Sequence, residues 1–120
     1  MRQAYERLIT VKEFAFGGVG FAGTTSEGEK ALRMILASTN ALSLFRSALS
    51  KGSSEAKLYA LCGLRQLDRP SLEKESTALV KADLEVTTMS GSIVRHERAA
   101  TVVKRIAAGM YDGQISRARP

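Results

Sequence analysis

The sequence predicts a mainly α-helical fold, built as a compact bundle of five to six short helices. Three observations support this. The chain has 120 residues, the size of one ordinary domain. Apolar residues make up 44% of it and charged residues 25%, as in globular proteins. Apolar side chains recur at three- and four-residue steps through most of the chain, which is the spacing of one helix face. We therefore expect a single helical domain over residues 1–113 and a flexible C-terminal tail over residues 114–120.

The first half of the chain contains three expected helices. Residues 3–14 place apolar side chains three or four positions apart, with charged ones between them. A second helix starts near Ser26, because Ser26 and Glu29 have the S-x-x-E spacing of a capping box. A third covers residues 41–50, just before a lysine and a glycine that are typical of a helix end.

The second half contains three more. Residues 53–67 are apolar around nearly the whole helix circumference, which predicts a central helix packed on both sides. Pro70 cannot continue that helix, but it suits the first turn of another over residues 70–82. The last expected helix covers residues 96–109, where an apolar stripe ends at a glycine.

Two segments do not fit a helix. Residues 16–25, FGGVGFAGTT, contain four glycines and two threonines, which favour a loop or a short extended piece. Residues 84–94, LEVTTMSGSIV, combine strand-forming residues with a Ser-Gly-Ser turn. The second segment fits either a short hairpin or an irregular crossover, and the sequence leaves both open.

The middle of the chain resembles one HEAT-type repeat. SEAKLYALCGLRQLD is similar to the first helix of such a repeat, DRPS to its turn and LEKESTALVKAD to its second helix, together residues 53–83. No clean second copy follows at the expected period of about 40 residues. The resemblance implies stacked, HEAT-like helix pairs and a role in binding other proteins.

Glycines near residue 20 match a nucleotide-binding spacing. Gly18 to Gly23 read G-x-G-x-x-G, but in a dinucleotide site such glycines lie between a strand and a helix of a βαβ unit. Here the preceding residues are expected to be helical. GTTSEGEK, residues 23–30, lacks the Gly-Lys-Ser/Thr of a P-loop, which argues against nucleotide hydrolysis. A small-molecule site at this loop remains an alternative, with the candidate binding residues Gly18, Gly20, Gly23, Thr24 and Thr25.

The sequence shows no catalytic or metal centre. Cys62 lies among leucines and fits a small core residue, whereas His96 lies among charged residues and fits an exposed helix start. No motif joins either to a nucleophile, base and orienting acid. A structural zinc site takes four Cys or His ligands, and the chain has one of each. We therefore expect no catalytic residue, no metal, no cofactor and no enzymatic activity.

The charge is basic. The formal net charge is +6, and basic side chains outnumber acidic ones from Arg95 to the C-terminus. Arg95, His96, Arg98 and Arg105 are the candidate binding residues of this region. They could contact nucleic acid, although no aromatic residue lies between them and no helix-turn-helix pattern is present. Nucleic-acid binding is therefore an alternative rather than the leading prediction.

The leading prediction is a small, non-enzymatic protein–protein interaction module, similar in class to bacterial immunity or adaptor proteins. Its expected partner is another protein or a second copy in a homodimer. No apolar run approaches the ~20 residues that span a bilayer, so no membrane partner is expected. No apolar signal core follows Met1. We expect a cytoplasmic protein, or a periplasmic or secreted one if Met1 replaces a removed signal peptide.

Overall fold

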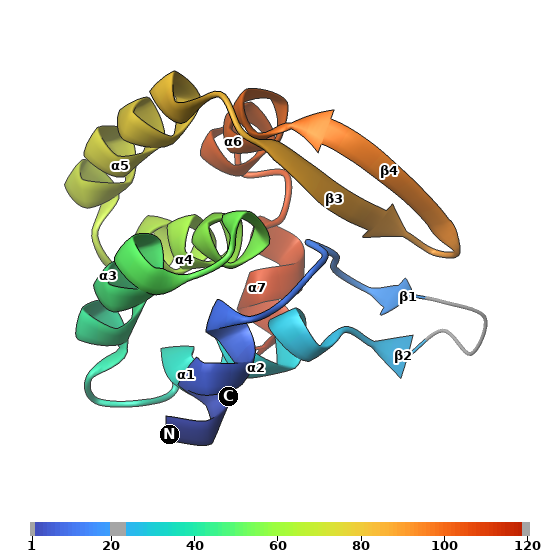
Figure 1. The fold of residues 1–120 in the computed structure, drawn as a ribbon. Coiled ribbons are helices and arrows are strands. Elements are labelled where there is room, and N and C mark those ends of the chain that lie inside the picture. The colour runs from blue at the N-terminus through green and yellow to red at the C-terminus, as the bar shows by residue number, and fades with distance from the viewer. Residues whose placement is uncertain (1, 20–23, 119–120) are drawn as a thin grey trace.

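The computed structural model describes residues 2–19 and 24–118, and it confirms the mainly α-helical fold, with 65% helix (Figure 1). The described residues form seven helices: α1 (Arg2–Ile9), α2 (Glu27–Leu36), α3 (Ala41–Lys51), α4 (Ser54–Leu67), α5 (Arg69–Ala82), α6 (Ala99–Ala107) and α7 (Asp112–Ala118). They also form four strands: β1 (Gly18–Val19), β2 (Thr24–Thr25), β3 (Glu85–Ser90) and β4 (Ile93–Arg98). None of the helices in the described ranges is long and apolar enough to cross a membrane.

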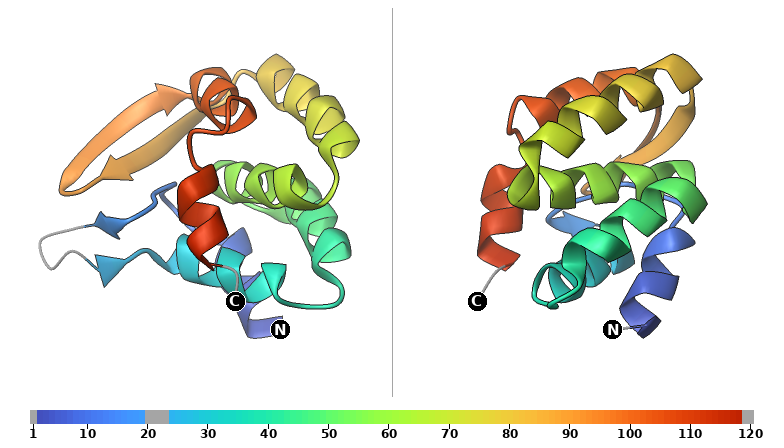
Figure 2. Two further views of the ribbon diagram at one scale, coloured as in Figure 1. Left: turned by 180° about the vertical axis from the view of Figure 1, so that it is seen from behind. Right: turned by 90° about the vertical axis from the view of Figure 1, so that its left-hand side faces the viewer.

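The helices pack around α4 (Figures 1 and 2). α5 and α6 lie on one side of α4, and α1, α2 and α3 lie on the other. The side chains of Tyr59, Leu61 and Leu64 are 0% exposed. A helix surrounded on both sides must be apolar around most of its circumference, as α4 is. The central position predicted for residues 53–67 is therefore confirmed.

Local signals place the helix starts correctly. Ser26 accepts the Glu29 N–H at the start of α2, and Ser53 accepts the Ala56 N–H at the start of α4, each at 3.1 Å. Pro70 lies in the first turn of α5, where its missing N–H costs nothing. The expected capping box at α2 is only half formed, because the Glu29 carboxylate bonds elsewhere.

α1 is shorter than predicted. The helix expected over residues 3–14 ends at Ile9, and the chain then runs extended toward β3. The Phe14 N–H donates to the Thr87 carbonyl at 2.9 Å, and the Met89 N–H donates to the Phe14 carbonyl at 3.2 Å. These bonds place Phe14 beside β3 as a short parallel partner. A long-range pairing therefore overrides the helical pattern here.

β3 and β4 form an antiparallel hairpin, so the hairpin alternative for residues 84–94 is the correct one. Gly91 and Ser92 form its turn, and Gly91 has a φ of +58° at the first turn position. The hairpin continues to Arg98, pairing His96 with Thr87 and Arg98 with Glu85. The prediction of a helix from residue 96 is wrong at its start, since α6 begins at Ala99.

Two further predictions concern the glycine-rich segment and the C-terminus. Within residues 16–25, the described residues 16–19 and 24–25 are not helical, as expected, and β1 pairs antiparallel with β2. Residues 20–23 lie outside the described residues. The chain continues as α7 through Ala118, where the sequence predicts a flexible tail from residue 114. Ile115 is 1% exposed and belongs to the core, which fixes that helix to the bundle.

Candidate functional site

A groove lies between the β3–β4 hairpin, the segment around Phe14 and the α6–α7 connection. Its volume is about 450 Å³. We call it the hairpin groove, and its lining residues are Phe14, Ala15, Phe16, Thr88, Met89, Ser90, Ile93, Arg95, Glu97, Arg105, Met110, Tyr111 and Gln114. Three segments far apart in the sequence thus build one concave surface.

Aromatic rings form one wall of the hairpin groove. The ring centres of Phe14 and Tyr111 are 5.2 Å apart in an edge-to-face arrangement, and those of Phe16 and Tyr111 are 5.3 Å apart. Phe14 also lies 5.4 Å from Phe16. Such contacts each contribute about 0.5–1.5 kcal/mol beyond burial, so they stabilise the arrangement of the three rings.

The hairpin supplies the opposite wall through one face of its strands. Thr88 pairs with Arg95, and residues two apart along a strand share a face. Ile93, Arg95 and Glu97 of β4 therefore lie on the same face as Thr88. This face lines the groove, so the alternation along β4 brings these three side chains to the same surface.

An ion pair spans the groove from strand to helix. The Arg105 guanidinium binds the Glu97 carboxylate through both terminal nitrogens, and the Thr88 hydroxyl donates to the same carboxylate at 2.5 Å. The bond from Arg105 holds the pKa of the Glu97 carboxyl below its ordinary value, although burial opposes the shift. The same bond raises the pKa of Arg105. Glu97 is thus held ionised with its bonding capacity largely used.

Arg95 differs from Arg105 in its partners. Within the described ranges no carboxylate lies within ion-pair distance of Arg95, although it lines the groove beside Glu97. The groove therefore holds two cations and one anion, with a positive charge left over at its exposed edge. A ligand that carries a carboxylate would complement this charge.

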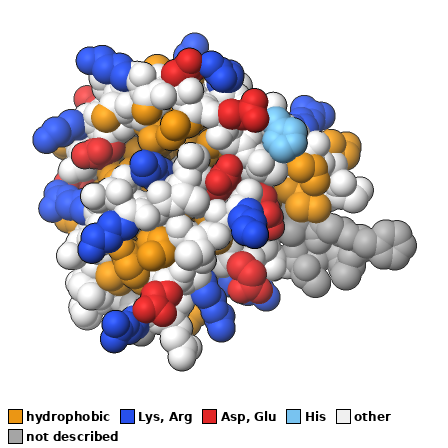
Figure 3. Space-filling model, viewed as in Figure 1, with side chains coloured by type: hydrophobic (Ala, Val, Ile, Leu, Met, Phe, Trp, Pro, Cys, Tyr) orange, Lys and Arg blue, Asp and Glu red, His pale blue; other side chains and the backbone are white. Residues whose placement is uncertain are grey.

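Large apolar side chains lie exposed both in the groove, at Ile93 and Met110, and on the opposite face of β4, at Val94. Ile93 is 56% exposed, its neighbour Val94 54% and Met110 66%. Figure 3 shows hydrophobic side chains gathered beside His96, the pale blue residue on the hairpin. Clustered apolar exposure next to a concave surface is typical of an interaction site.

The structure brings two of the sequence-predicted basic residues together and separates the others. Arg95 and Arg105 both line the hairpin groove. His96 and Arg98 lie on the opposite face of β4, where Arg98 binds Asp83 through two contacts of 2.7 Å. The helix predicted from residue 96 would have included both Arg98 and Arg105, but Arg98 belongs to β4 and Arg105 to α6, so the two do not share a helix face.

The predicted glycine-loop residues do not form a nucleotide fingerprint. Gly18 lies in β1, and Thr24 and Thr25 lie in β2; Gly20 and Gly23 lie outside the described residues. β1 and β2 pair antiparallel, so the motif joins two strands of a hairpin. A dinucleotide site needs the motif between a strand and a helix.

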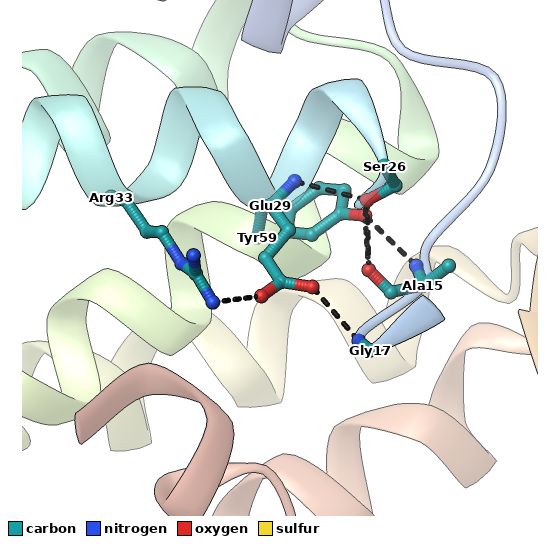
Figure 4. A network of polar contacts seen from close by, with 6 residues as sticks. All are labelled: Ala15, Gly17, Ser26, Glu29, Arg33 and Tyr59. Atoms are coloured by element: carbon teal, nitrogen blue, oxygen red, sulfur yellow. Dashed lines mark hydrogen bonds and ion pairs between the residues drawn. The ribbon is translucent and has the colours of Figure 1, made fainter. Parts of the chain in front are cut away.

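A second polar cluster, the Tyr59 network, holds the aromatic wall in place (Figure 4). The Ala15 N–H donates to the Tyr59 hydroxyl at 2.8 Å, and that hydroxyl donates to the Ala15 carbonyl at 2.9 Å. Ser26 donates to the same carbonyl at 3.0 Å. Burial raises the pKa of the Tyr59 hydroxyl, so it stays neutral.

Glu29 completes this network. It is 1% exposed, accepts the Gly17 N–H at 2.8 Å and binds Arg33 at 2.6 Å (Figure 4). Its carboxylate therefore fastens the end of the Phe14–Gly17 segment to α2. The Tyr59 network is a structural feature that positions the groove wall.

The described residues contain no other reactive cluster. No group of three or more His, Cys, Asp or Glu side chains within these ranges could hold a metal ion. Cys62 is 0% exposed, and burial raises the pKa of its thiol. Thiolate is the reactive form, so Cys62 acts as a core residue.

The sequence reasoning missed most of the groove. Phe14, Phe16 and Tyr111 were not candidate site residues, nor were Ile93 and Met110. One signal was available: Phe14 and Phe16 are two residues apart across the end of the predicted helix, which is the spacing of an extended segment. Their meeting with Tyr111 depends on the fold and has no local signal.

Comparison with known proteins found no family model, curated protein or solved structure that matches the chain. The HEAT-like resemblance of residues 53–83 thus stays a prediction.

Proposed function

We propose that this protein is a small, non-enzymatic protein–protein interaction module that binds its partner through the hairpin groove. One observation carries the proposal. Ile93 and Met110 are each more than half exposed, and both line a groove whose other wall is aromatic. Burying one such side chain contributes about 1.5–3 kcal/mol, so covering both supports a stable complex.

A protein partner fits this arrangement better than a small molecule. A small ligand inside the groove would leave the rim side chains in water. A protein segment can fill the groove and cover Ile93 and Met110 together. The central anchor with a surrounding apolar and charged rim is the usual anatomy of protein interfaces.

Catalysis has little support at this surface. Glu97 is the groove carboxylate, and its lowered pKa makes it a poor general base near neutral pH. His96 lies on the opposite face of β4, at 3.3 Å from the Thr87 hydroxyl. The Thr88 hydroxyl bonds to Glu97 at 2.5 Å, but the lowered pKa of that carboxyl makes it a weak base for activating the hydroxyl.

Nucleic-acid binding is the second candidate, favoured by the net charge of +6. Two of the four predicted contact residues argue against it, since Arg98 and Arg105 already bind Asp83 and Glu97. Phosphate-driven binding weakens steeply with salt, so salt dependence separates the two candidates.

The test is quantitative affinity capture from lysate, followed by reconstitution with the purified partner. The wild type is compared with Ile93→Asp and Met110→Asp, and with Val80→Asp as the matched control. Val80 is 41% exposed on α5, and it is not among the residues that line the hairpin groove. We expect one stoichiometric protein partner whose affinity falls at least roughly tenfold for both groove variants and stays unchanged for the control.

Two results would contradict the proposal. One is a partner that Val80→Asp loses as completely as Ile93→Asp does. The other is recovery of nucleic acid alone, bound with a steep salt dependence that Ile93→Asp leaves unchanged.

A further inference from the structure

β4 has one paired edge, and the hydrogen bonds identify it. On β3, the Thr87 carbonyl and the Met89 N–H both bond to Phe14. Successive residues of a strand direct their main-chain groups to opposite edges. Thr88 therefore directs its main-chain N–H and C=O groups toward β4, where its register partner is Arg95. Arg95 in turn directs its main-chain groups toward β3.

The opposite edge of β4 is unpaired within the described chain. Val94 and His96 flank Arg95, so their main-chain N–H and C=O groups point away from β3. Neither makes a main-chain hydrogen bond with another described residue. The hairpin extends from the bundle and all of β4 except Glu97 is exposed (Figure 1). A row of free main-chain donors and acceptors is a template for another strand.

A strand added to this edge would continue the two faces of the hairpin. On one face it would extend the groove wall made by Ile93 and Arg95. On the other face it would contact Val94, which is 54% exposed. An extended segment with alternating side chains can therefore cover apolar surface on both faces at once.

The charges of this region select an acidic segment. Arg95 has no carboxylate partner among the described residues, and it lies next to the open edge. Protein binding at such a site places a carboxylate opposite the free guanidinium. The net charge of +6 attracts acidic chains over a longer distance.

We infer that the open edge of β4 accepts an extended, acidic segment of a partner protein as a third antiparallel or parallel strand of the hairpin sheet. An apolar side chain of that segment fills the hairpin groove, and one carboxylate binds Arg95. The inference rests on the proposed function and specifies the form and charge of the partner.

A second copy of this chain fits the edge less well. Only Val94, His96 and Arg98 direct main-chain groups outward, so they must pair with one another across a two-fold axis. An axis at Arg95 places two like-charged guanidinium groups opposite each other. An axis at His96 places the apolar side chain of Val94 opposite the charged side chain of Arg98. Two molecules of net charge +6 also repel each other.

The experiment selects from a displayed library of random twelve-residue peptides on the full-length protein. Selected peptides are then measured against wild type, His96→Pro and His96→Ala. Proline removes the outward N–H of residue 96 and is tolerated on an exposed strand edge, whereas alanine keeps the N–H. We expect acidic peptides with alternating apolar residues that bind wild type and His96→Ala alike, and His96→Pro roughly tenfold more weakly.

Hydrogen exchange on the wild-type complex tests the same point without a variant. The amides of Val94 and His96 should exchange more slowly once a selected peptide is bound. In free His96→Pro, protection of the Thr88 and Arg95 amides reports whether the hairpin itself is intact.

The outcomes separate the inference from the proposed function. Peptides that lose binding to Ile93→Asp but bind His96→Pro normally, and leave Val94 and His96 unprotected, overturn strand addition alone. Peptides insensitive to both variants overturn the inference and the groove together. Selection of basic peptides, or a wild-type dimer in sedimentation that His96→Pro dissociates, also overturns the inference.

Discussion

The Tyr59 network and the hairpin groove both contain a carboxylate bound by an arginine, yet only the groove has a further arginine without a described anionic partner. In the Tyr59 network, Glu29 is 1% exposed and its two oxygens bind Gly17 and Arg33. In the groove, Glu97 is bound by Arg105 and Thr88, but Arg95 beside it has no described anionic partner. A buried carboxylate with both oxygens bonded maintains the fold, whereas a cluster with an unpaired cation at an exposed edge indicates a binding site.

The largest expected effect is on the Tyr59 network. Tyr59→Ala removes a fully buried ring and both of its bonds to Ala15. Deleting a buried aromatic side chain costs about 3–5 kcal/mol of unfolding free energy. Urea unfolding followed by circular dichroism measures this loss. A change below about 1 kcal/mol would contradict the structural role of the network.

A smaller loss is expected when an atom is added beside the same ring. A Cβ on Gly28 would lie 2.2 Å from Tyr59 Cε2, closer than packed atoms approach. Alanine ordinarily stabilises a helix interior by about 1 kcal/mol relative to glycine. We expect the opposite sign for Gly28→Ala, a loss of about 1–3 kcal/mol from overpacking. A more stable variant in urea unfolding would show that the ring has room to move.

Glu97→Gln tests how much the groove ion pair contributes to stability. The folded-state pKa of Glu97 is lowered, so its stabilisation is present above the ordinary glutamate pKa and is lost as pH falls through the lowered value. The stability difference between wild type and Glu97→Gln should therefore be present at neutral pH and shrink on acidification. Glu73→Gln, at an exposed position of α5, is the control. A difference that grows on acidification would contradict the ionised state of Glu97.

Arg95→Ala should have the smallest effect on stability and a clear effect on binding. An exposed arginine without a described partner contributes within about 0.5 kcal/mol to unfolding free energy. Loss of its contact with an acidic segment should weaken the partner or the selected peptides severalfold. Thermal unfolding and fluorescence anisotropy of a labelled peptide measure the two effects. Substantial destabilisation with unchanged binding would reverse the contrast between Arg95 and Tyr59.

The sequence predicted what depends on local signals. α4 is apolar around its circumference and lies at the centre, and Ser26, Ser53 and Pro70 mark helix starts correctly. The hairpin at residues 84–94 was one of two readings, because Ser-Gly-Ser suits a turn with either geometry. Local propensity was sufficient wherever a helix packs mainly through its own repeating face.

The groove depends on contacts that no local pattern reveals. Phe14 leaves the predicted helix because Thr87, distant in sequence, supplies a main-chain partner. The pairing of β4 with β3, in which His96 lies opposite Thr87, moves His96 from a helix start to a strand. Arg95 and Arg105 were candidates for a basic surface, but Glu97 changes that surface by neutralising one of them. Pairing between distant segments decided each of these outcomes.

The most direct test of the central claim is hydrogen exchange of the full-length protein with and without its captured partner. The account predicts slower exchange in three segments that surround the groove: residues 14–17, 86–98 and 109–112. Exchange in the exposed parts of α3 and α5 should stay unchanged. Protection confined to α3 or α5, with the hairpin unaffected, would contradict the claim that the hairpin groove is the binding surface.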